Sequence, residues 1–239
     1  MRLVLDTRGP KRQILAGLIE LPGASRMTGV SIGADALRWL TAVRDTDGSL
    51  RVHAHGSIPL PHDTISSGVI RDTEALSDAI AEMGKACGAS VVHGVLPDES
   101  AHVFALASDA MPEVAEFEIA RRLGVAPERM YYDMDRTDYD SAVGVFPRAL
   151  AKAYVDAFSR AGVRLSSLEI AARAAARSLA YHFEDVPVAL LVDLSGSRAV
   201  ISEVRHGLTV SNAVYAIEDA EDAAQSLRSE EHTSELQSH

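Results

Sequence analysis

The stretch VALLVDLSGSRAVISEVRHGLTV, residues 188–210, decides how the rest of the chain is interpreted. Its first five residues are a continuous apolar run, which predicts a strand covered on both faces. Asp193 follows at the end of that strand. Ser195, Gly196 and Ser197 then predict a tight turn of small residues that leads into a second strand. Backbone N–H groups in such a turn can approach a phosphate closely.

An earlier segment repeats this pattern. Residues 28–32 predict a short apolar strand, residues 33–36 a turn of small residues that begins with Gly33, and residues 37–43 the returning strand. Two strand–turn–strand units far apart in the chain therefore predict a nucleotide held between two hairpins whose turns face its phosphates.

Length, charge and cysteine content narrow the function classes. A chain of 239 residues can form one domain or two closely associated ones. Its net charge of −11 argues against a nucleic-acid-binding surface, which needs a basic face. The single cysteine, Cys87, excludes an internal disulfide and is expected to be a buried thiol. Since no apolar run approaches the roughly 20 residues that cross a bilayer, we expect no direct membrane insertion.

Both ends of the chain differ from the rest. The stretch RSEEHTSELQSH, residues 228–239, is typical of a translated sequencing adapter, so we expect the natural protein to continue past Leu227. Residues 1–26 fit either an ordinary N-terminal extension or translated upstream DNA, because Met27 directly precedes the first predicted strand. Charged residues interrupt this segment and exclude a signal peptide.

Strands and helices alternate between the two hairpins. Apolar residues at helical spacing predict helices at residues 72–85, 112–123, 148–161 and 171–181. Short apolar runs predict strands at residues 50–57, 90–96, 102–107 and 165–170. Asp72 is the expected N-cap of the first helix, and Gly162 the residue that ends the third. This order of elements predicts an α/β fold with a mixed sheet.

Four segments resemble the PilM family in their order and spacing. They are IPLPHDTISSGVIRDTEALSDAIAEM (58–83), VVHGVLPDESAHVFAL (91–106), EFEIARRLGVAPERMYYDMD (116–135) and VFPRALAKAYVDAFSRAGVRLSSLEIAARAAARSLA (145–180). PilM is the actin-like cytoplasmic component of type IV pilus assembly. Its relatives include the cell-division protein FtsA and the cytoplasmic part of the type II secretion protein GspL. The resemblance covers residues 27–214.

The resemblance implies an actin-like (RNase H-like) ATPase fold. Subdomain 1A would take residues 27–89 and 144–187, a small inserted subdomain of the 1C type residues 90–143, and the start of the second half residues 188–227. It also implies a cytoplasmic scaffold of pilus assembly at the inner-membrane face. There the protein would bind the N-terminal peptide of a PilN-like protein in the groove between the subdomains, with helix 112–123 as one wall.

The phosphate loops depart from the family pattern. The family's first loop reads approximately D-I-G-S-S-S-x-K, whereas residues 31–38 read SIGADALR. Ser31 replaces the metal-side aspartate, Asp35 introduces a carboxylate that would repel phosphate, and Arg38 keeps the positive charge. The second loop, Asp193-Leu194-Ser195-Gly196, shifts the family's glycine by one position.

The resemblance still implies an ATP site. It implies Gly33, Arg38, Asp193, Ser195, Gly196 and Ser197 around the phosphates, with Asp193 on Mg²⁺. The departures predict weak or absent hydrolysis, so holding partners would be the main role. A degenerate scaffold that binds no nucleotide is the alternative.

Other functions compete with this interpretation. Asp133-Met134-Asp135-Arg136-Thr137 fits the D-x-D-x-T motif of haloacid dehalogenase-type phosphatases, in which the first aspartate is the nucleophile and the second the acid/base. A solvated acidic turn is the more ordinary explanation of these residues. An FtsA-like division protein or a GspL-like secretion component would have the same fold but would act in cell division or in type II secretion.

Two groups of polar residues have ordinary explanations. Two pairs of histidines could be considered as metal ligands: His93 and His102, which are predicted on neighbouring strands, and His53 and His55, which are two residues apart. Neither pair has a third ligand at the spacing of a metal site. Arg173 and Arg177 lie four residues apart on one helical face, where they could face an acidic peptide of a partner or water; water is the preferred prediction.

Overall fold

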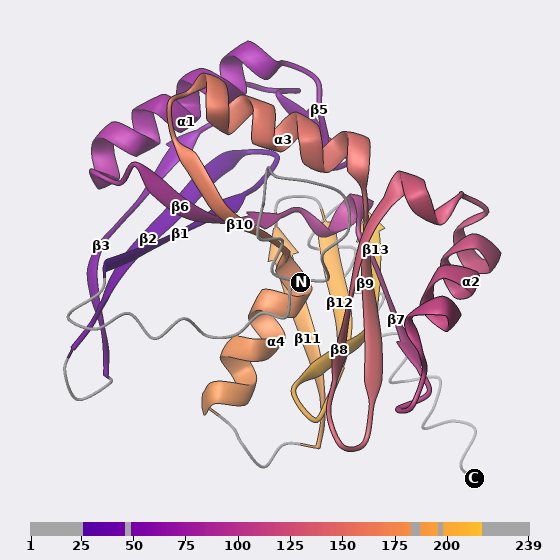
Figure 1. Cartoon of the computed structure of the whole chain (residues 1–239). Helices are drawn as coiled ribbons and strands as arrows, with labels where there is room; N and C mark the ends of the chain where they lie inside the picture. The colour runs from indigo at the N-terminus through magenta and orange to yellow at the C-terminus, as the bar shows by residue number, and fades with distance from the viewer. Residues whose placement is uncertain (1–25, 46–48, 183–186, 196–197, 217–239) are drawn as a thin grey trace, which may run out of the picture.

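The computed structural model describes residues 26–45, 49–182, 187–195 and 198–216, which form two large β-sheets with helices packed on and between them (Figure 1). Both terminal segments and the turn residues Gly196 and Ser197 lie outside these ranges. Within the described part of the chain, no helix is long and apolar enough to span a membrane.

The first sheet has five strands in the order β10-β6-β1-β2-β3. Strands β1 (Arg26–Ile32), β2 (Ala36–Arg44) and β3 (Leu50–Pro59) form an antiparallel meander, whereas β6 (Val91–Leu96) and β10 (Arg164–Ile170) are parallel to β1. Helices α1 (Thr73–Cys87) and α3 (Arg148–Arg160) contact each other and lie together on one side of this sheet (Figure 1). The short strands β4 (Ile65–Ser66) and β5 (Val69–Ile70) precede α1.

Helix ends follow the predicted signals. Asp72 caps α1, because its carboxylate accepts hydrogen bonds from the N–H groups of Glu74 (3.0 Å) and Ala75 (2.9 Å). Gly88 ends α1 with a φ of 63°, and Gly162 follows α3 with a φ of 71°, both in the left-handed region that favours glycine. Cys87 is buried, as expected.

The second sheet has six strands in the order β11-β12-β13-β7-β9-β8. All its pairings are antiparallel. The strands are β11 (Val188–Ser195), β12 (Arg198–Arg205), β13 (Leu208–Ala216), β7 (His102–Leu106), β9 (Ser141–Pro147) and β8 (Met130–Arg136). One-turn 3₁₀ helices, η1 (Asp98–Ser100) and η2 (Pro127–Arg129), lead into β7 and β8.

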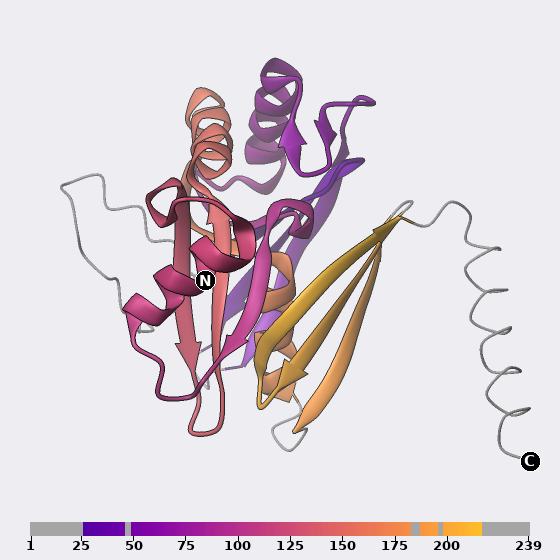
Figure 2. The ribbon, with the colours of Figure 1, turned by 90° about the vertical axis from the view of Figure 1, so that its right-hand side faces the viewer.

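Two helices lie on opposite faces of the second sheet. Ala115 and Ile119 of α2 (Pro112–Leu123) form a small core with Val143 and Val145 of β9 and their neighbours. The intervening residue, Gly144, faces the side chain of Arg173 on α4 (Ala171–His182). Because side chains alternate along a strand, α2 and α4 cover different faces. Figures 1 and 2 show α2 on the outside of the molecule and α4 between the sheets.

The strand pairing shifts the expected subdomain boundaries. The insertion was expected to span residues 90–143, but β6, at its start, pairs with β1 and β10 inside the first sheet. At the other end, β9 extends the second sheet to Pro147. The segment that leaves the first sheet therefore begins after Leu96 and returns at α3.

The prediction that residues 188–192 form a strand covered on both faces is wrong. Strand β11 lies at the edge of the second sheet, and α4 packs against one of its faces. The side chains of Val188, Leu190, Val192 and Leu194 alternate onto the other face, where they are 56–69% exposed. Among the described residues, no element covers this second face.

Candidate functional site

The turn between β1 and β2 forms the first predicted phosphate loop. Gly33 donates its N–H to the carbonyl oxygen of Ala36 (3.0 Å). A Cβ at position 33 would lie 2.9 Å from Oδ1 of Asp35 and 3.1 Å from Nη1 of Arg38. A larger residue at position 33 would therefore require the exposed side chains of Asp35 and Arg38 to move aside.

Asp35 engages the cation of this turn. The guanidinium of Arg38 donates two hydrogen bonds to the Asp35 carboxylate, at 2.6 and 3.2 Å. The hydrogen bond from Arg38 holds the pKa of Asp35 below its usual value and raises the pKa of Arg38. Arg38 therefore offers phosphate a cation that an adjacent carboxylate already neutralises.

The second hairpin comes close to the first. The hydrogen bond and the charge of Asp35 are the larger causes of the raised pKa of Arg38. The negative charge of Asp193, which is exposed on β11, raises this pKa further. Asp193 therefore lies within electrostatic range of Arg38, while the arrangement of both hairpins around one ligand stays a prediction. Ser195 is the last residue of β11, while Gly196 and Ser197 lie outside the described residues.

A small cavity lies beside Asp193, at the N-terminus of α4. It holds about 30 Å³ and is lined by Asp98, Ala171, Ala172, Ala175, Leu191, Asp193, Val200 and Ser202. A volume of this size accommodates about one water molecule. The cavity is therefore too small for a nucleotide as it stands.

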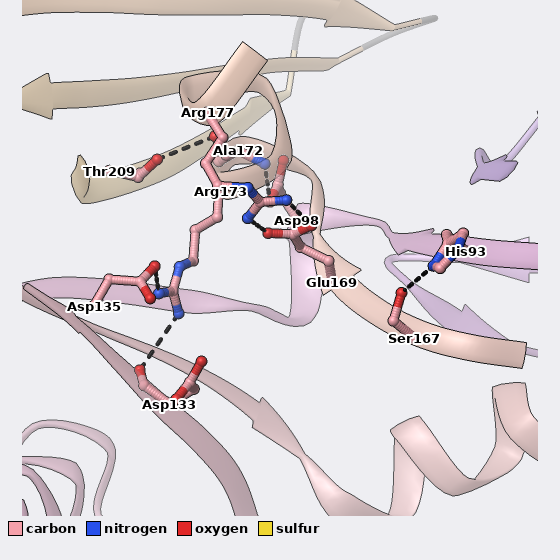
Figure 3. A network of polar contacts seen from close by, with 10 residues as sticks. All are labelled: His93, Asp98, Asp133, Asp135, Ser167, Glu169, Ala172, Arg173, Arg177 and Thr209. Atoms are coloured by element: carbon pink, nitrogen blue, oxygen red, sulfur yellow. Dashed lines mark hydrogen bonds and ion pairs between the residues drawn. The ribbon is translucent and has the colours of Figure 1, made fainter. Parts of the chain in front are cut away.

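Asp98 is a buried member of this cavity that the sequence analysis missed. Its Oδ1 accepts the Ala172 N–H at 3.1 Å, so a residue after β6 binds the first turn of α4 (Figure 3). Burial, with smaller contributions from the charges of Glu99 and Asp193, raises the pKa of Asp98 to about 7. Its position directly after an apolar parallel strand was the available signal, because polar sites gather at the carboxyl ends of such strands.

The first turn of α4 is fixed from several sides (Figure 3). The hydroxyl of Thr209 on β13 donates to the carbonyl oxygen of Ala172 at 3.0 Å. Arg173 forms an ion pair with Asp135 of β8 and donates to the carbonyl oxygen of Asp133 at 3.4 Å. The contacts of α4 therefore join the cavity to the far edge of the second sheet.

The prediction that Arg173 faces water is wrong. Its side chain is 3% exposed, and burial lowers its pKa to about 10, with the charge of Asp133 acting in the opposite direction. Gly144 leaves space for it, since a Cβ there would overlap the guanidinium. Arg177, four residues on, has a side chain that is 54% exposed and pairs with Glu169 of β10.

The phosphatase alternative is wrong in this structure. Its motif requires the first strand of a parallel sheet, whereas Asp133 and Asp135 lie on β8, an antiparallel strand at the edge of the second sheet. Asp135 is engaged by Arg173. The simpler expectation of a solvated turn is also wrong, because both residues belong to a strand.

The histidines form no metal centre in the described part of the chain. His93 lies in the first sheet and bonds to the Ser167 hydroxyl at 2.7 Å, whereas His102 lies on β7 of the second sheet, so the two are not on neighbouring strands. His53 and His55 are exposed on β3. No group of three His, Cys, Asp or Glu side chains that could hold a metal ion occurs among the described residues.

Helix α2 does not face the first sheet, so its expected role as a wall of the groove between the subdomains is wrong. It packs on the outer face of the second sheet, opposite α4. Its two cations, Arg121 and Arg122, both bind Glu118, at 2.6 and 2.7 Å. These hydrogen bonds lower the pKa of Glu118 to about 2.

Comparison with known proteins supports the fold. The sequence matches no protein-family model and no curated protein. The structure is similar to a chain of the PilM-PilN type IV pilus biogenesis complex, with a TM-score of 0.69 and 18% identity. The match covers 82% of this chain and 62% of that chain, so this chain spans less than two thirds of its length.

Two further solved structures are similar. The cytoplasmic domain of EpsL, an inner-membrane component of the type II secretion system of Vibrio cholerae, gives a TM-score of 0.53 at 12% identity and matches 80% of this chain and 70% of that one. A Bacteroides thetaiotaomicron protein of unknown function with an actin-like ATPase fold gives 0.51 at 10% identity, over 92% and 81%. The chain therefore has an actin-like fold, as its resemblance to the PilM family implied.

Proposed function

We propose that this chain is a PilM-like scaffold that binds the N-terminal peptide of a PilN-like inner-membrane protein. The likeness to the chain of the PilM-PilN complex, over 82% of the residues, carries this proposal. The bound peptide would hold the protein at the cytoplasmic face of the inner membrane, where it would contact other pilus assembly proteins. No membrane insertion of its own is needed for this role.

The peptide is expected between the two sheets and not on α2. Helix α4 contacts strands of both sheets, and its first turn is tied to Asp98 on one side and to Asp135 on the other. A rigid junction of this kind keeps both sides of a binding site in one geometry, which lowers the entropy lost on binding.

Nucleotide binding is proposed as weak, and hydrolysis as weaker still. Three of the residues expected around ATP and Mg²⁺ fit a phosphate-binding site only in part: Gly33, Arg38 and Asp193. Arg38 is held by Asp35, so Asp35, Arg38 and Asp193 together present one net negative charge to a triphosphate. Ser31 replaces the family's metal-side aspartate, which leaves Asp193 as the main candidate for the metal. The geometry therefore fits a protein that binds partners better than one that hydrolyses ATP.

A calorimetric titration tests the partner. The probe is a synthetic peptide with the cytoplasmic N-terminal residues of the PilN-like protein from the same organism. We expect saturable one-to-one binding, and no heat from the same residues in scrambled order. Absence of binding, or equal binding of the scrambled peptide, would overturn the proposal.

A secretion role is the second candidate, because the EpsL cytoplasmic domain has the same fold. Deletion of the gene separates the two systems. A PilM-like role predicts loss of surface pili with normal secretion of exported enzymes. Loss of secretion with normal pili would favour the EpsL-like role, and filamentous undivided cells would favour an FtsA-like role.

A further inference from the structure

Asp98 is a buried carboxyl group that no described cation compensates. It is 4% exposed, and one of its oxygens accepts the Ala172 N–H at 3.1 Å (Figure 3). The other oxygen has no hydrogen-bond partner among the described residues. The two charges that act on Asp98, those of Glu99 and Asp193, are both negative. A carboxylate in such surroundings is stable only with a bound proton or a bound cation.

The arginines around this cavity already have carboxylate partners. The four ion pairs are Arg38–Asp35, Arg173–Asp135, Arg177–Glu169 and Arg198–Glu99. The charge of Arg38 also acts on Asp193, but the hydrogen bond and the charge of Asp35 act on Arg38 more strongly. With these pairs counted, the charge beside the cavity is negative in the described part of the chain.

The cavity contains a second buried polar group without a partner. Ser202 of β12 is 2% exposed and lines the cavity, and its hydroxyl makes no hydrogen bond with any described residue. Val200, two positions earlier, lies on the same face of β12 and pairs with Asp193 of β11. The cavity therefore brings together oxygen atoms from three segments: Asp98 after β6, Asp193 on β11 and Ser202 on β12.

We propose that Asp98, Asp193 and Ser202 bind a Mg²⁺ ion in this cavity in the absence of nucleotide. Mg²⁺ prefers oxygen ligands and is usually held by one or two carboxylates, with water at its remaining positions. The volume of about 30 Å³ suits one small ion. Asp193 is exposed on β11, so water can reach the ion from that side. Ca²⁺ usually takes more protein oxygens than this cavity offers.

Asp98 would supply the carboxylate that Ser31 lacks. Strands β1 and β6 are parallel neighbours, and Val95 of β6 pairs with Ser31 of β1. The carboxyl ends of these strands therefore meet at one edge of the first sheet, and Asp98 lies three positions beyond Val95. A bound ion would also tie the β11–β12 hairpin to η1. The inference extends the metal role proposed for Asp193 and does not rest on peptide binding.

Mn²⁺ is the probe that locates the ion, because it takes the same oxygen ligands as Mg²⁺ and broadens the NMR signals of nearby nuclei. The titration uses ¹⁵N-labelled protein at pH 8, where the Asp98 carboxyl is ionised, without nucleotide or peptide. We expect the amide signals of Asp98, Ala172 and Ser202 to broaden first. Excess Mg²⁺ should restore them.

Matched variants identify the ligands. Asp98→Asn keeps an oxygen for the Ala172 N–H but removes the negative charge, and we expect Mn²⁺ affinity to fall at least about tenfold. Ser202→Ala removes a neutral ligand and should weaken binding by a smaller factor. Asp138→Asn, at an exposed carboxylate in the β8–β9 hairpin, is the control and should leave affinity unchanged.

Thermal unfolding provides a second measurement. Mg²⁺ should raise the unfolding temperature of the wild-type protein and of Asp138→Asn, but not that of Asp98→Asn, because a ligand stabilises only the state that binds it. Three results would overturn the inference: no site-specific broadening, broadening centred on the β1–β2 turn, or equal affinity of wild-type protein and Asp98→Asn. Neither measurement contains the PilN-like peptide, so failure of this inference and failure of the proposed function are distinguishable.

Discussion

Two Arg–Asp pairs in this protein have the same chemistry and opposite consequences. Arg38 and Asp35 meet at the tip of a hairpin, where their side chains are 50% and 56% exposed. Arg173 and Asp135 join α4 to the edge of the second sheet, and the arginine is 3% exposed. Water screens the first pair, so its main effect is on what the hairpin can bind. The second pair compensates a charge buried between structural layers, so its main effect is on stability.

Asp135→Ala provides the largest test of this contrast. It leaves the Arg173 guanidinium buried without its partner, and we expect the free energy of unfolding to fall by about 3 kcal/mol, the low end for such losses because Asp135 is itself 37% exposed. Urea denaturation followed by circular dichroism measures the change. Asp138→Ala, at an exposed position in the same hairpin, is the control and should change stability little. Equal effects of both substitutions would remove the contrast.

Gly144→Ala tests the space that the buried pair needs. The added methyl would overlap the Arg173 guanidinium, and we expect a loss of about 2 kcal/mol, as for overpacked cores. Gly29→Ala is the control, since nothing lies within 4 Å of a Cβ at that strand position. The same urea titration compares them, and a neutral Gly144→Ala would show that Arg173 is free to move aside.

Asp98→Asn tests the buried carboxyl at the other side of α4. Because the pKa of Asp98 is raised to about 7 from its ordinary 3.8, the folded state keeps its proton while the unfolded state loses it. The free energy of unfolding should therefore fall as pH rises from about 4 to about 7, and level off above. The amide removes this contribution.

When the pH is raised from 5 to 8, the free energy of unfolding of the wild-type protein should fall by more than about 1 kcal/mol relative to that of Asp98→Asn. Chemical denaturation at the two pH values measures it. A difference that is independent of pH would show that Asp98 is ionised throughout this range.

Asp35→Ser is expected to have the smallest effect on stability. The exposed pair contributes about 0–1 kcal/mol, so unfolding should change by no more than that. Affinity for Mg·ATP should instead rise about tenfold, because Arg38 is released from a charge-assisted hydrogen bond. Calorimetry measures the affinity. A large loss of stability, or an unchanged affinity, would show that exposure does not separate the two pairs.

Local features were predictable from the sequence. The β1–β2 hairpin, the Asp72 cap and the bounds of α2 follow from alternation, capping and helical periodicity over a few residues.

Contacts between distant segments were not predictable in the same way. The alanine-rich α4 does not show in its own sequence that both its sides are covered, so Arg173 was expected in water. Asp98 becomes a site residue only because η1 meets the first turn of α4, 74 positions away. Similarly, the apolar run of β11 indicates a strand but does not show that one of its faces is open among the described residues.

ATP turnover distinguishes a scaffold that holds partners from a working ATPase. We expect the protein to bind the PilN-like peptide and to show no Mg²⁺-dependent ATP hydrolysis above background, because Asp35 neutralises Arg38 and Ser31 offers no carboxylate to a metal ion. Phosphate release is measured with and without Mg²⁺ for the wild-type protein and for Asp193→Ala. Turnover that depends on Mg²⁺ and is abolished by Asp193→Ala would contradict the account and make the protein a working ATPase.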